Sequence, residues 1–239
     1  MNLRRPRRAA DRLIVALDFT SMAPALAMAR RLRGVVRIVK VGSALFTAAG
    51  PQALQRLRAL GFDIMLDLKF FDIPNTVELS CRAATHLRAA LVTVHAQGGA
   101  LMLAAAVRGV RAEARRYGLP RPRVLAVTVL TSVEGRRQTG RDVIRRARAA
   151  LEGQCDGVVA SAQEAAGLRR TFGNQLAIVC PGIRPAAAAR ADQRRVGTPA
   201  QALSAGADAL VIGRPITAAS DPRAAAQRVL DEMEAATGF

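Results

Sequence analysis

Short runs of apolar and β-branched residues alternate along this chain with longer stretches in which apolar positions recur at helical spacing. Strands that are apolar on both faces are typical of a parallel sheet covered by helices. We therefore expect an α/β fold with a parallel sheet. The eight predicted strands cover residues 12–18, 36–42, 63–69, 91–96, 123–131, 156–161, 176–182 and 209–213.

The stretches between these runs carry residues that begin and end helices. Pro51 and Pro199 each open an amphipathic stretch, and proline favours the first helical turn. Gly34, Gly61 and Gly206 stand near the ends of such stretches, where glycine commonly terminates a helix. Eight strand–helix units in 239 residues match a (β/α)8 barrel, the TIM barrel, of typically about 250 residues. A doubly wound open sheet is the alternative, but no G-x-G-x-x-G follows the first predicted strand.

One domain accounts for this pattern. Hydrophobic residues make up 51% of the chain, enough for a single large core, and no linker divides it. We expect the barrel to span residues 12–239 and the basic residues 1–11 to form a disordered arm. Three cysteines without a CxxC spacing argue against disulfides and a zinc site, and there is no secretion signal or membrane-spanning run. These features predict a cytoplasmic protein with no membrane partner.

A formal net charge of +18 makes nucleic acid a conceivable partner. The arginines are scattered, however, often as pairs on predicted helix faces, and only seven Phe and one Tyr are available for base stacking. The pattern favours solvated helix faces over a nucleic-acid surface. A general positive field would still attract a small polyanionic substrate.

Lysine is almost absent from this basic chain. Of the 36 Lys and Arg residues only Lys40 and Lys69 are lysines, and each stands at or near the end of a predicted strand. An ammonium can be tuned to donate a proton, whereas a guanidinium effectively never gives one up. The two lysines therefore suggest proton chemistry rather than charge alone.

Polar residues gather where the predicted strands end, and in a barrel these ends converge on one mouth. Asp67 and Lys69 share a face of their strand, since side chains alternate with period two. With Lys40 and Asp72 they can form a set of alternating charge that stabilises developing charge without rearrangement. The role of His95 stays open between catalysis and support of the mouth. The full set at the strand ends is Asp18, Lys40, Asp67, Lys69, Asp72, His95, Thr131, Ser132, Gly182, Arg184, Gly213 and Arg214.

Two glycine-arginine pairs mark the ends of the last two predicted strands. They are Gly182-Ile183-Arg184 and Gly213-Arg214. Barrels frequently bind phosphate at this place, where glycine allows a close backbone approach and arginine can grip the oxygens in a bidentate fashion. The pattern predicts a phosphate site.

These residues resemble one family over nearly the whole chain from residue 12. The segment D-L-K-F-F-D-I-P-N-T at 67–76 is similar to the signature of orotidine 5'-phosphate decarboxylases, which convert OMP to UMP in pyrimidine synthesis. The likeness continues, in order, through A-L-D at 16–18, V-K-V-G at 39–42, V-H-A at 94–96, A-V-T-V-L-T-S at 126–132, P-G-I-R at 181–184, D-Q-R-R-V-G-T-P at 192–199 and V-I-G-R-P-I-T at 211–217. The resemblance implies a (β/α)8 barrel that acts as a homodimer without metal or organic cofactor.

The resemblance also implies individual roles. Lys69 would protonate C6 of the pyrimidine, and Asp67 would face the substrate carboxylate or orient Lys69. Lys40 would hold this network and the ribose, and Asp18 would bind a ribose hydroxyl. The segment 185–192 would be a mobile loop over the phosphate. Asp72, Ile73 and Thr76 would serve the other subunit's site, Thr131 and Ser132 would read the pyrimidine edge, and Arg184, Gln193, Gly213 and Arg214 would bind phosphate.

Two alternatives remain open at this point. A magnesium-dependent decarboxylase of sugar-phosphate keto acids shares a D-x-K-x-x-D element on the same barrel, but its relatives typically lack a lysine at the position of Lys40 and the I-P-N-T continuation. A basic nucleic-acid-binding barrel without catalysis would use the high net charge, but the intact ionic set at 67–72 argues against it.

Overall fold

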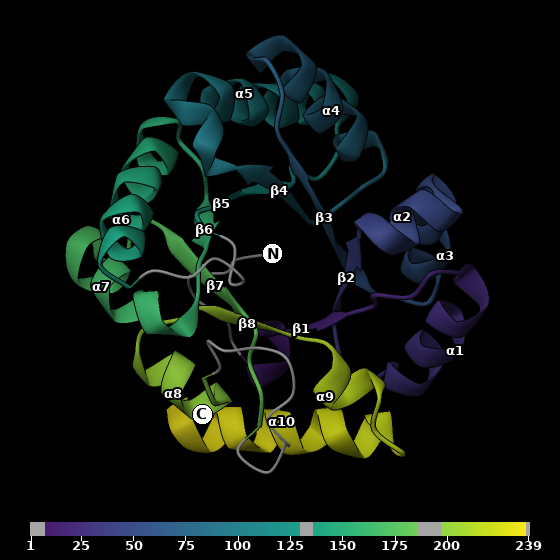
Figure 1. The fold of residues 1–239 in the computed structure, drawn as a ribbon. Coiled ribbons are helices and arrows are strands. Elements are labelled where there is room, and N and C mark those ends of the chain that lie inside the picture. The colour runs from purple at the N-terminus through teal and green to yellow at the C-terminus, as the bar shows by residue number, and fades with distance from the viewer. Residues whose placement is uncertain (1–7, 130–135, 186–196, 238–239) are drawn as a thin grey trace.

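A computed structural model describes residues 8–129, 136–185 and 197–237. Within them eight parallel strands form a closed barrel in which each strand pairs with its neighbour in sequence and β8 pairs with β1 (Figure 1). The predicted (β/α)8 barrel is confirmed. The strands are β1 Leu13–Ala16, β2 Ile38–Gly42, β3 Asp63–Phe70, β4 Leu91–His95, β5 Arg123–Val127, β6 Gly157–Val159, β7 Ala177–Pro181 and β8 Ala209–Ile212.

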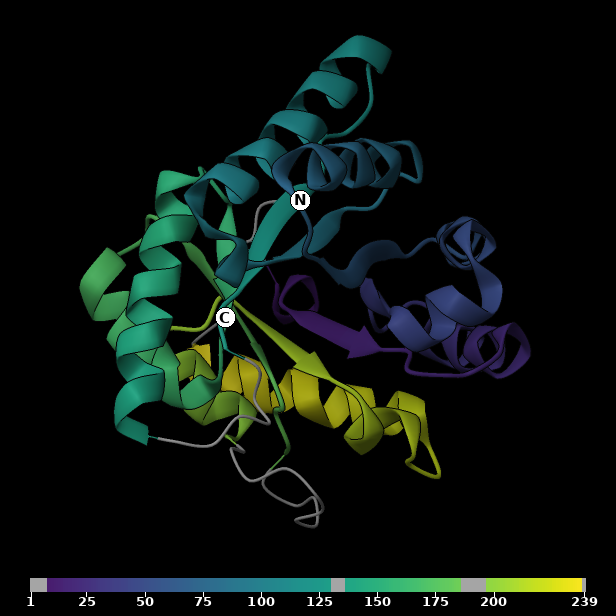
Figure 2. The same cartoon turned by 45° about the horizontal axis from the view of Figure 1, so that its top comes forward.

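Helices form a ring outside the barrel. Figures 1 and 2 show α10 along its outer side, next to α1, α8 and α9. Pro51 and Pro199 begin helices as predicted, and Gly34, Gly61 and Gly206 follow helices with positive φ angles. The helices are η1 Ala9–Asp11, α1 Met22–Leu32, α2 Ser43–Ala49, α3 Pro51–Ala59, α4 Pro74–His86, η2 Ala96–Gly98, α5 Gly99–Tyr117, α6 Arg136–Glu152, α7 Ala162–Phe172, α8 Pro199–Ser204, α9 Arg214–Thr217 and α10 Pro222–Thr237.

The strands bury two separate apolar layers because their side chains alternate between the barrel interior and the helices. The layer under the helices is the larger one, and burial of each large aliphatic side chain in it contributes roughly 1.5–3 kcal/mol. The interior layer fills the barrel, so the centre of the molecule is packed and a site in the barrel must lie at its mouth. The interior residues are Ile14, Ala16, Ile38, Met65, Leu91, Leu125, Val127, Val159, Ala177, Val179, Ala209 and Val211.

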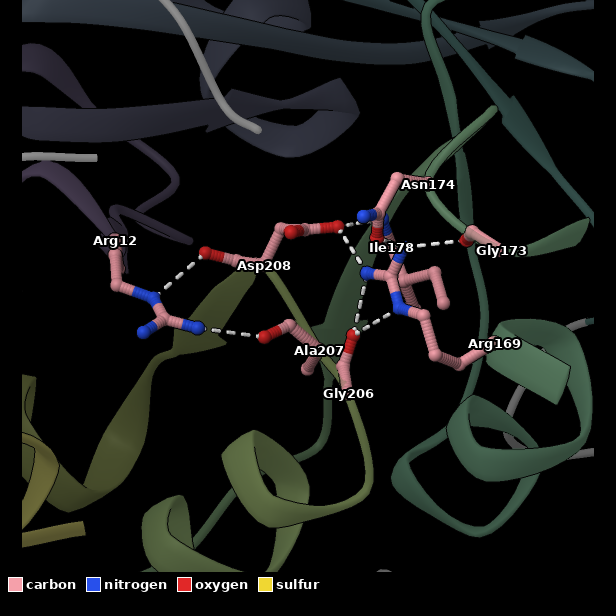
Figure 3. Close-up of polar contacts among 8 residues, drawn as sticks. All are labelled: Arg12, Arg169, Gly173, Asn174, Ile178, Gly206, Ala207 and Asp208. Carbon is pink, nitrogen blue, oxygen red and sulfur yellow. Dashed lines mark hydrogen bonds and ion pairs between the residues drawn. The ribbon is translucent and has the colours of Figure 1, made fainter. Parts of the chain in front are cut away.

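Carboxylates tie the amino-terminal ends of the strands together. Asp208, just before β8, accepts hydrogen bonds from the backbone N–H of Ile178 in β7 and from Arg169 of α7, both at 2.7 Å (Figure 3). Arg12 donates to the carbonyl oxygens of Asp208 and Ala207 from the β1 side. These hydrogen bonds thus stabilise the amino-terminal end of the barrel.

Asp156 repeats this arrangement before β6. Its carboxylate accepts from the backbone N–H of Val124 in β5, and Arg121 and Arg123 donate to it as well. Burial alone would raise the pKa of Asp156, but these hydrogen bonds outweigh burial and lower it. The ionised carboxylate therefore fastens β5 to β6.

Residues 9–11, which were expected to belong to a disordered arm, are structured. Ala9–Asp11 form a short 3-10 helix in which Ala9 is buried, and Asp11 accepts a hydrogen bond from Arg37 at 2.8 Å. These residues belong to the fold because a small apolar side chain packs and a carboxylate finds a partner. Residues 1–7 lie outside the described residues.

Two further sequence expectations can be compared with the structure. Strand β5 ends at Val127, several residues before the predicted end at 131, because its pairings with β4 and β6 end there, opposite His95 and Val159. Arginine pairs close several helices, as predicted for solvated faces; Arg30 and Arg31, for example, lie exposed in the last turn of α1. In the described ranges no helix is long and apolar enough to cross a bilayer.

Candidate active site

A cavity of about 310 Å³ opens at the carboxyl ends of the strands, as predicted for the barrel mouth. This volume lies at the lower end of the range for small-molecule sites, about 300–1,000 Å³. Charged side chains of β1 to β3 line one part of the cavity, and the ends of β7 and β8 line another part, with β8 next to β1 in the barrel. The cavity is lined by Ala16, Asp18, Lys40, Met65, Asp67, Lys69, Val127, Val129, Val159, Ala160, Pro181, Gly182, Ile183, Arg184, Val211, Gly213, Arg214 and Pro215.

The charged wall is a chain of ion pairs. Lys40 Nζ lies 2.8 Å from Asp18 Oδ1 and 3.4 Å from Asp67 Oδ2. Lys69 Nζ approaches the same Asp67 oxygen to 2.9 Å. The side chains of Lys40 and Asp67 are 10% and 11% exposed, so this pair is well shielded from water, whereas that of Lys69 is 37% exposed in the cavity. The structure thus brings together Asp18, Lys40, Asp67 and Lys69, as the sequence predicted.

Asp67 is held as a carboxylate. Burial alone would raise its pKa, but the charges of Lys40 and Lys69, with hydrogen bonds from Lys69 and Thr93, outweigh burial and bring the pKa below its ordinary value of 3.8. Asp67 therefore supplies a fixed negative charge between the two ammonium groups. Such a preorganised array stabilises charge that develops beside it without a reorganisation of solvent.

The backbone of β3 is irregular where it presents these groups. The pairing between β3 and β4 shifts between Leu66 and Phe70, and Lys69 has a φ of 51°. A non-glycine residue rarely adopts this left-handed conformation, which costs on the order of 1 kcal/mol and clusters at functional sites. Lys69 therefore turns out of the regular ladder to reach back toward Asp67.

Gly42 leaves room for the pair between Lys40 and Asp18. A Cβ at this position would lie 3.0 Å from Lys40 Nζ and 3.1 Å from Asp18 Oδ1. Both atoms would have to move for any side chain to fit. The glycine of the V-K-V-G segment is thus explained by the close approach of two charged groups rather than by its own φ angle.

The ends of β7 and β8 contain the two predicted glycine-arginine pairs. Gly182, Ile183 and Arg184 follow β7, and Gly213 and Arg214 follow β8. Arg184 is 8% exposed, and its backbone N–H donates to the carbonyl of Gly197. Both pairs thus line the same cavity as the lysines, and Gly213 lies near Asp18, since a Cβ on Gly213 would be 4.0 Å from Asp18 Oδ2.

Apolar side chains line the rest of the cavity. Met65, Val127, Val159 and Val211 rise from the barrel interior to form the floor. The cavity thus combines charged groups with an apolar surface.

Asp72, Ile73 and Thr76 lie outside this cavity. All three are exposed, and the Oδ1 atom of Asp72 accepts a hydrogen bond from the N–H of Ile73 just before α4. Among the described residues no ion pair joins Asp72 to Lys40 or Lys69. A single chain therefore assembles the predicted alternating set without its fourth member.

Three predicted site residues, Thr131, Ser132 and Gln193, lie outside the described residues. So does nearly all of the predicted loop at 185–192, of which only Pro185 is described.

His95 ends β4 beside the mouth but does not line the cavity. Its ring contacts that of Phe71 with 5.5 Å between centroids. Burial, together with the charges of Arg146 and Lys69, lowers the pKa of His95 below its ordinary value of 6.5. The imidazole is thus neutral at pH 7, which favours a supporting role over that of a cation.

Sequence reasoning missed one polar residue of the cluster. Thr93 is fully buried, and its hydroxyl donates to Asp67 Oδ1 at 2.9 Å. A signal was present, because Thr93 lies two residues before His95 and so shares its face of the strand. The apolar floor was missed as well, since nothing in the sequence distinguishes a floor valine from any other strand valine.

The sequence matches the Orotidine 5'-phosphate decarboxylase / HUMPS family over residues 11–229. The chain belongs to this family. The resemblance seen in the sequence is thereby confirmed, and the family's span includes each of the four ionic residues that meet in the cavity.

Curated relatives named orotidine 5'-phosphate decarboxylase cover nearly the whole chain. The protein from Halorhodospira halophila is 49% identical over 233 residues, 94% of this chain and 97% of the relative. The one from Moorella thermoacetica is 46% identical over 235 residues, 95% and 93% of the two chains. The crystal structure of orotidine 5'-phosphate decarboxylase from Lactobacillus acidophilus superposes with a TM-score of 0.82 at 36% identity and covers 93% of this chain and 98% of its own. The family therefore shares both the sequence and the barrel of this chain.

Proposed function

We propose that this chain is a carboxy-lyase that converts orotidine 5'-monophosphate to uridine 5'-monophosphate in pyrimidine nucleotide synthesis. Family membership and the names of the curated relatives support this reaction. The observation that carries the mechanism is the array Lys40–Asp67–Lys69, in which one buried carboxylate oxygen meets two ammonium groups at the cavity wall.

The chemistry requires stabilisation of charge at carbon. The bond between C6 and the carboxylate breaks, CO2 leaves, and the electron pair stays on C6. The positive charge of Lys69 stabilises this carbanion, and a proton of its ammonium then forms the new C6–H bond. The neutral amine of Lys69 regains its proton from water, which returns the enzyme to its starting state.

Asp67 holds Lys69 in place and faces the departing carboxylate. Its pKa is lowered, so it remains ionised when an anionic substrate enters. Repulsion between the two carboxylates would be relieved as CO2 departs, and attraction between Asp67 and Lys69 persists throughout. Lys40, paired with both Asp67 and Asp18, fixes the array from behind and points Asp18 toward a ribose hydroxyl.

The phosphate is proposed to bind at the ends of β7 and β8. Arg184 and Arg214 line the cavity there with Gly182 and Gly213, and a guanidinium fits phosphate oxygens in a bidentate fashion. Gln193 is proposed to add to this site, and Thr131 and Ser132 to read the pyrimidine edge.

We further propose that the enzyme is a homodimer with shared active sites. Large apolar side chains stand exposed beside Asp72, among them Phe71 at 56% and Ile73 at 65%, and Leu101 at the start of α5 is 81% exposed. Exposed apolar surface of this kind marks protein contact sites. In the dimer, Asp72, Ile73 and Thr76 would complete the site of the partner.

A cytoplasmic location is part of the proposal. The reducing cytoplasm suits Cys81, Cys155 and Cys180, all of which are free and buried.

One experiment tests the reaction and separates the alternatives. The loss of OMP absorbance is followed with purified protein, with and without EDTA. We expect decay that EDTA does not change. The absence of decay would contradict the proposed reaction, whereas decay abolished by EDTA would favour a magnesium-dependent mechanism.

A further inference from the structure

Thr93 occupies a distinctive position inside the barrel. The three buried polar residues Lys40, Asp67 and Thr93 each stand two positions after an apolar interior residue of the same strand, namely Ile38, Met65 and Leu91. They thus form the first polar level above the apolar plug. Lys40 and Asp67 belong to the ionic array, while Thr93, with 0% exposure, adjoins it from β4 through its contact with Asp67.

The irregularity of β3 is centred on Thr93. Leu66 pairs with Val92, and the next pairing joins Phe70 to Val94, so the three residues 67–69 lie opposite Thr93 alone. Such a bulge disrupts the regular ladder of backbone hydrogen bonds. The N–H of Lys69 finds its acceptor in the hydroxyl oxygen of Thr93 at 2.9 Å. Since a buried N–H without an acceptor is costly, this bond stabilises the left-handed backbone of Lys69.

The same hydroxyl also orients the carboxylate of Asp67. A hydroxyl has a single proton, and that of Thr93 goes to Asp67 Oδ1 at 2.9 Å. The other oxygen, Oδ2, is the one that meets both Lys40 and Lys69. Thr93 on β4 therefore holds one carboxylate oxygen of Asp67. This contact fixes the rotation of the carboxylate group so that its second oxygen points at the ammonium groups.

We propose that Thr93 is a positioning residue for the proton transfer. It does not line the cavity; it acts through Lys69, whose backbone it holds, and through Asp67, whose carboxylate it orients. This inference rests on the proposed role of Lys69 as the proton donor. Loss of the hydroxyl would release both groups at once, while the proposed phosphate site at the ends of β7 and β8 would be left unchanged.

The consequence is a selective effect on turnover. The proposed phosphate site is expected to supply most of the substrate binding, so KM should change little, whereas kcat depends on where the ammonium stands when C6 becomes charged. Because the lost hydrogen bond orients a charged group, kcat should fall about 10- to 100-fold.

The test compares three variants with the parent enzyme. Thr93→Val keeps the shape and removes the hydroxyl, and Thr93→Ser keeps the hydroxyl. Thr85→Val is the matched control, because Thr85 is equally buried and its hydroxyl donates to the Cys81 carbonyl within α4, away from the site. We expect kcat to fall 10- to 100-fold in Thr93→Val with KM within about threefold, and to stay within about threefold of the parent in the other two.

Several outcomes would overturn the proposal. They are a kcat of Thr93→Val within threefold of the parent, a loss confined to KM, or a loss in Thr93→Ser equal to that in Thr93→Val. If Thr93→Val does not fold, Thr93→Cys replaces it with the same expectation, since a thiol is a weak donor.

Amide hydrogen exchange separates this inference from the proposed function, because it needs no substrate. The Lys69 amide should exchange at least about tenfold faster in Thr93→Val than in the parent and in Thr93→Ser. Unchanged exchange would contradict the positioning role even in an active enzyme. A different result would be faster exchange of the Lys69 amide in Thr93→Val together with turnover that survives substitution of Lys69. That result would contradict Lys69 as the proton donor but would support the contact between Thr93 and the Lys69 backbone.

Discussion

Lys69 Nζ lies 2.9 Å from Oδ2 of Asp67, two residues earlier on the same strand. In a regular strand side chains two apart are parallel and separated by nearly 7 Å at their Cα atoms. The left-handed φ of Lys69 and the shifted pairing of β3 bring the two charges together instead. The ion pair is thus a product of local backbone distortion as much as of charge.

Replacement of Lys69 by arginine tests the proton donor. Arginine keeps the positive charge but is a very poor acid, so Lys69→Arg should lose at least about a thousandfold in kcat. Binding of UMP, measured by calorimetry, should remain, because the proposed phosphate site is untouched. Decarboxylation within tenfold of the parent rate would contradict the assignment.

Arg214 should matter for binding rather than for chemistry on the pyrimidine. Arg214→Ala should raise KM for OMP about 100-fold, since a charge-assisted contact to phosphate contributes several kcal/mol. Orotidine, which lacks the phosphate, should be turned over equally slowly by the parent and the variant. Arg223→Ala, at an exposed arginine of α10, is the matched control and should leave KM unchanged. A large effect on orotidine turnover would place Arg214 elsewhere in the mechanism.

Shared active sites can be tested by mixing two inactive variants. Lys69→Ala and Asp72→Ala should each be nearly inactive as homodimers. After exchange of subunits, half of the dimers are hybrids with one intact site of two, so activity should recover to about a quarter of the parent. Light scattering checks that the protein is dimeric. No recovery despite proven exchange would contradict a role for Asp72 across the interface.

Asp156 should stabilise the barrel in a pH-dependent manner. Its pKa is lowered in the folded state, so its contribution is fully present above the unfolded pKa, near 4, and is lost as pH falls through the folded pKa. At pH 7, Asp156→Asn should lower the unfolding free energy by about 2 kcal/mol, because a charged acceptor for two arginines and a backbone N–H is lost.

The measurement is denaturant unfolding of parent and Asp156→Asn at several pH values. The difference in unfolding free energy between the two proteins should narrow below pH 4. Asp142→Asn serves as control, because Asp142 forms only a solvent-exposed pair with Arg145. A gap that stays constant down to pH 2 would contradict the proposed charge effect.

Much of the fold could be predicted because its signals are local. The prolines at 51 and 199 and the glycines at 34, 61 and 206 act on their own turns, and continuous apolar runs identify buried parallel strands whatever surrounds them. Strand ends were predicted less well, because the end of a strand such as β5 depends on where its neighbours β4 and β6 stop pairing with it. The short helix at Ala9–Asp11 likewise depends on contacts with distant residues, such as that of Asp11 with Arg37.

By itself the sequence determined the barrel, the resemblance to the family and the strand-end positions of Asp18, Lys40, Asp67 and Lys69, because strand pattern and strand-end position are properties of a single segment. Only the tertiary structure decided that Asp72 stands apart from them in one chain and that Thr93 joins them from the next strand. The reason is register: a bulge that places residues 67–69 opposite one threonine is a relation between two strands, and no single segment encodes it.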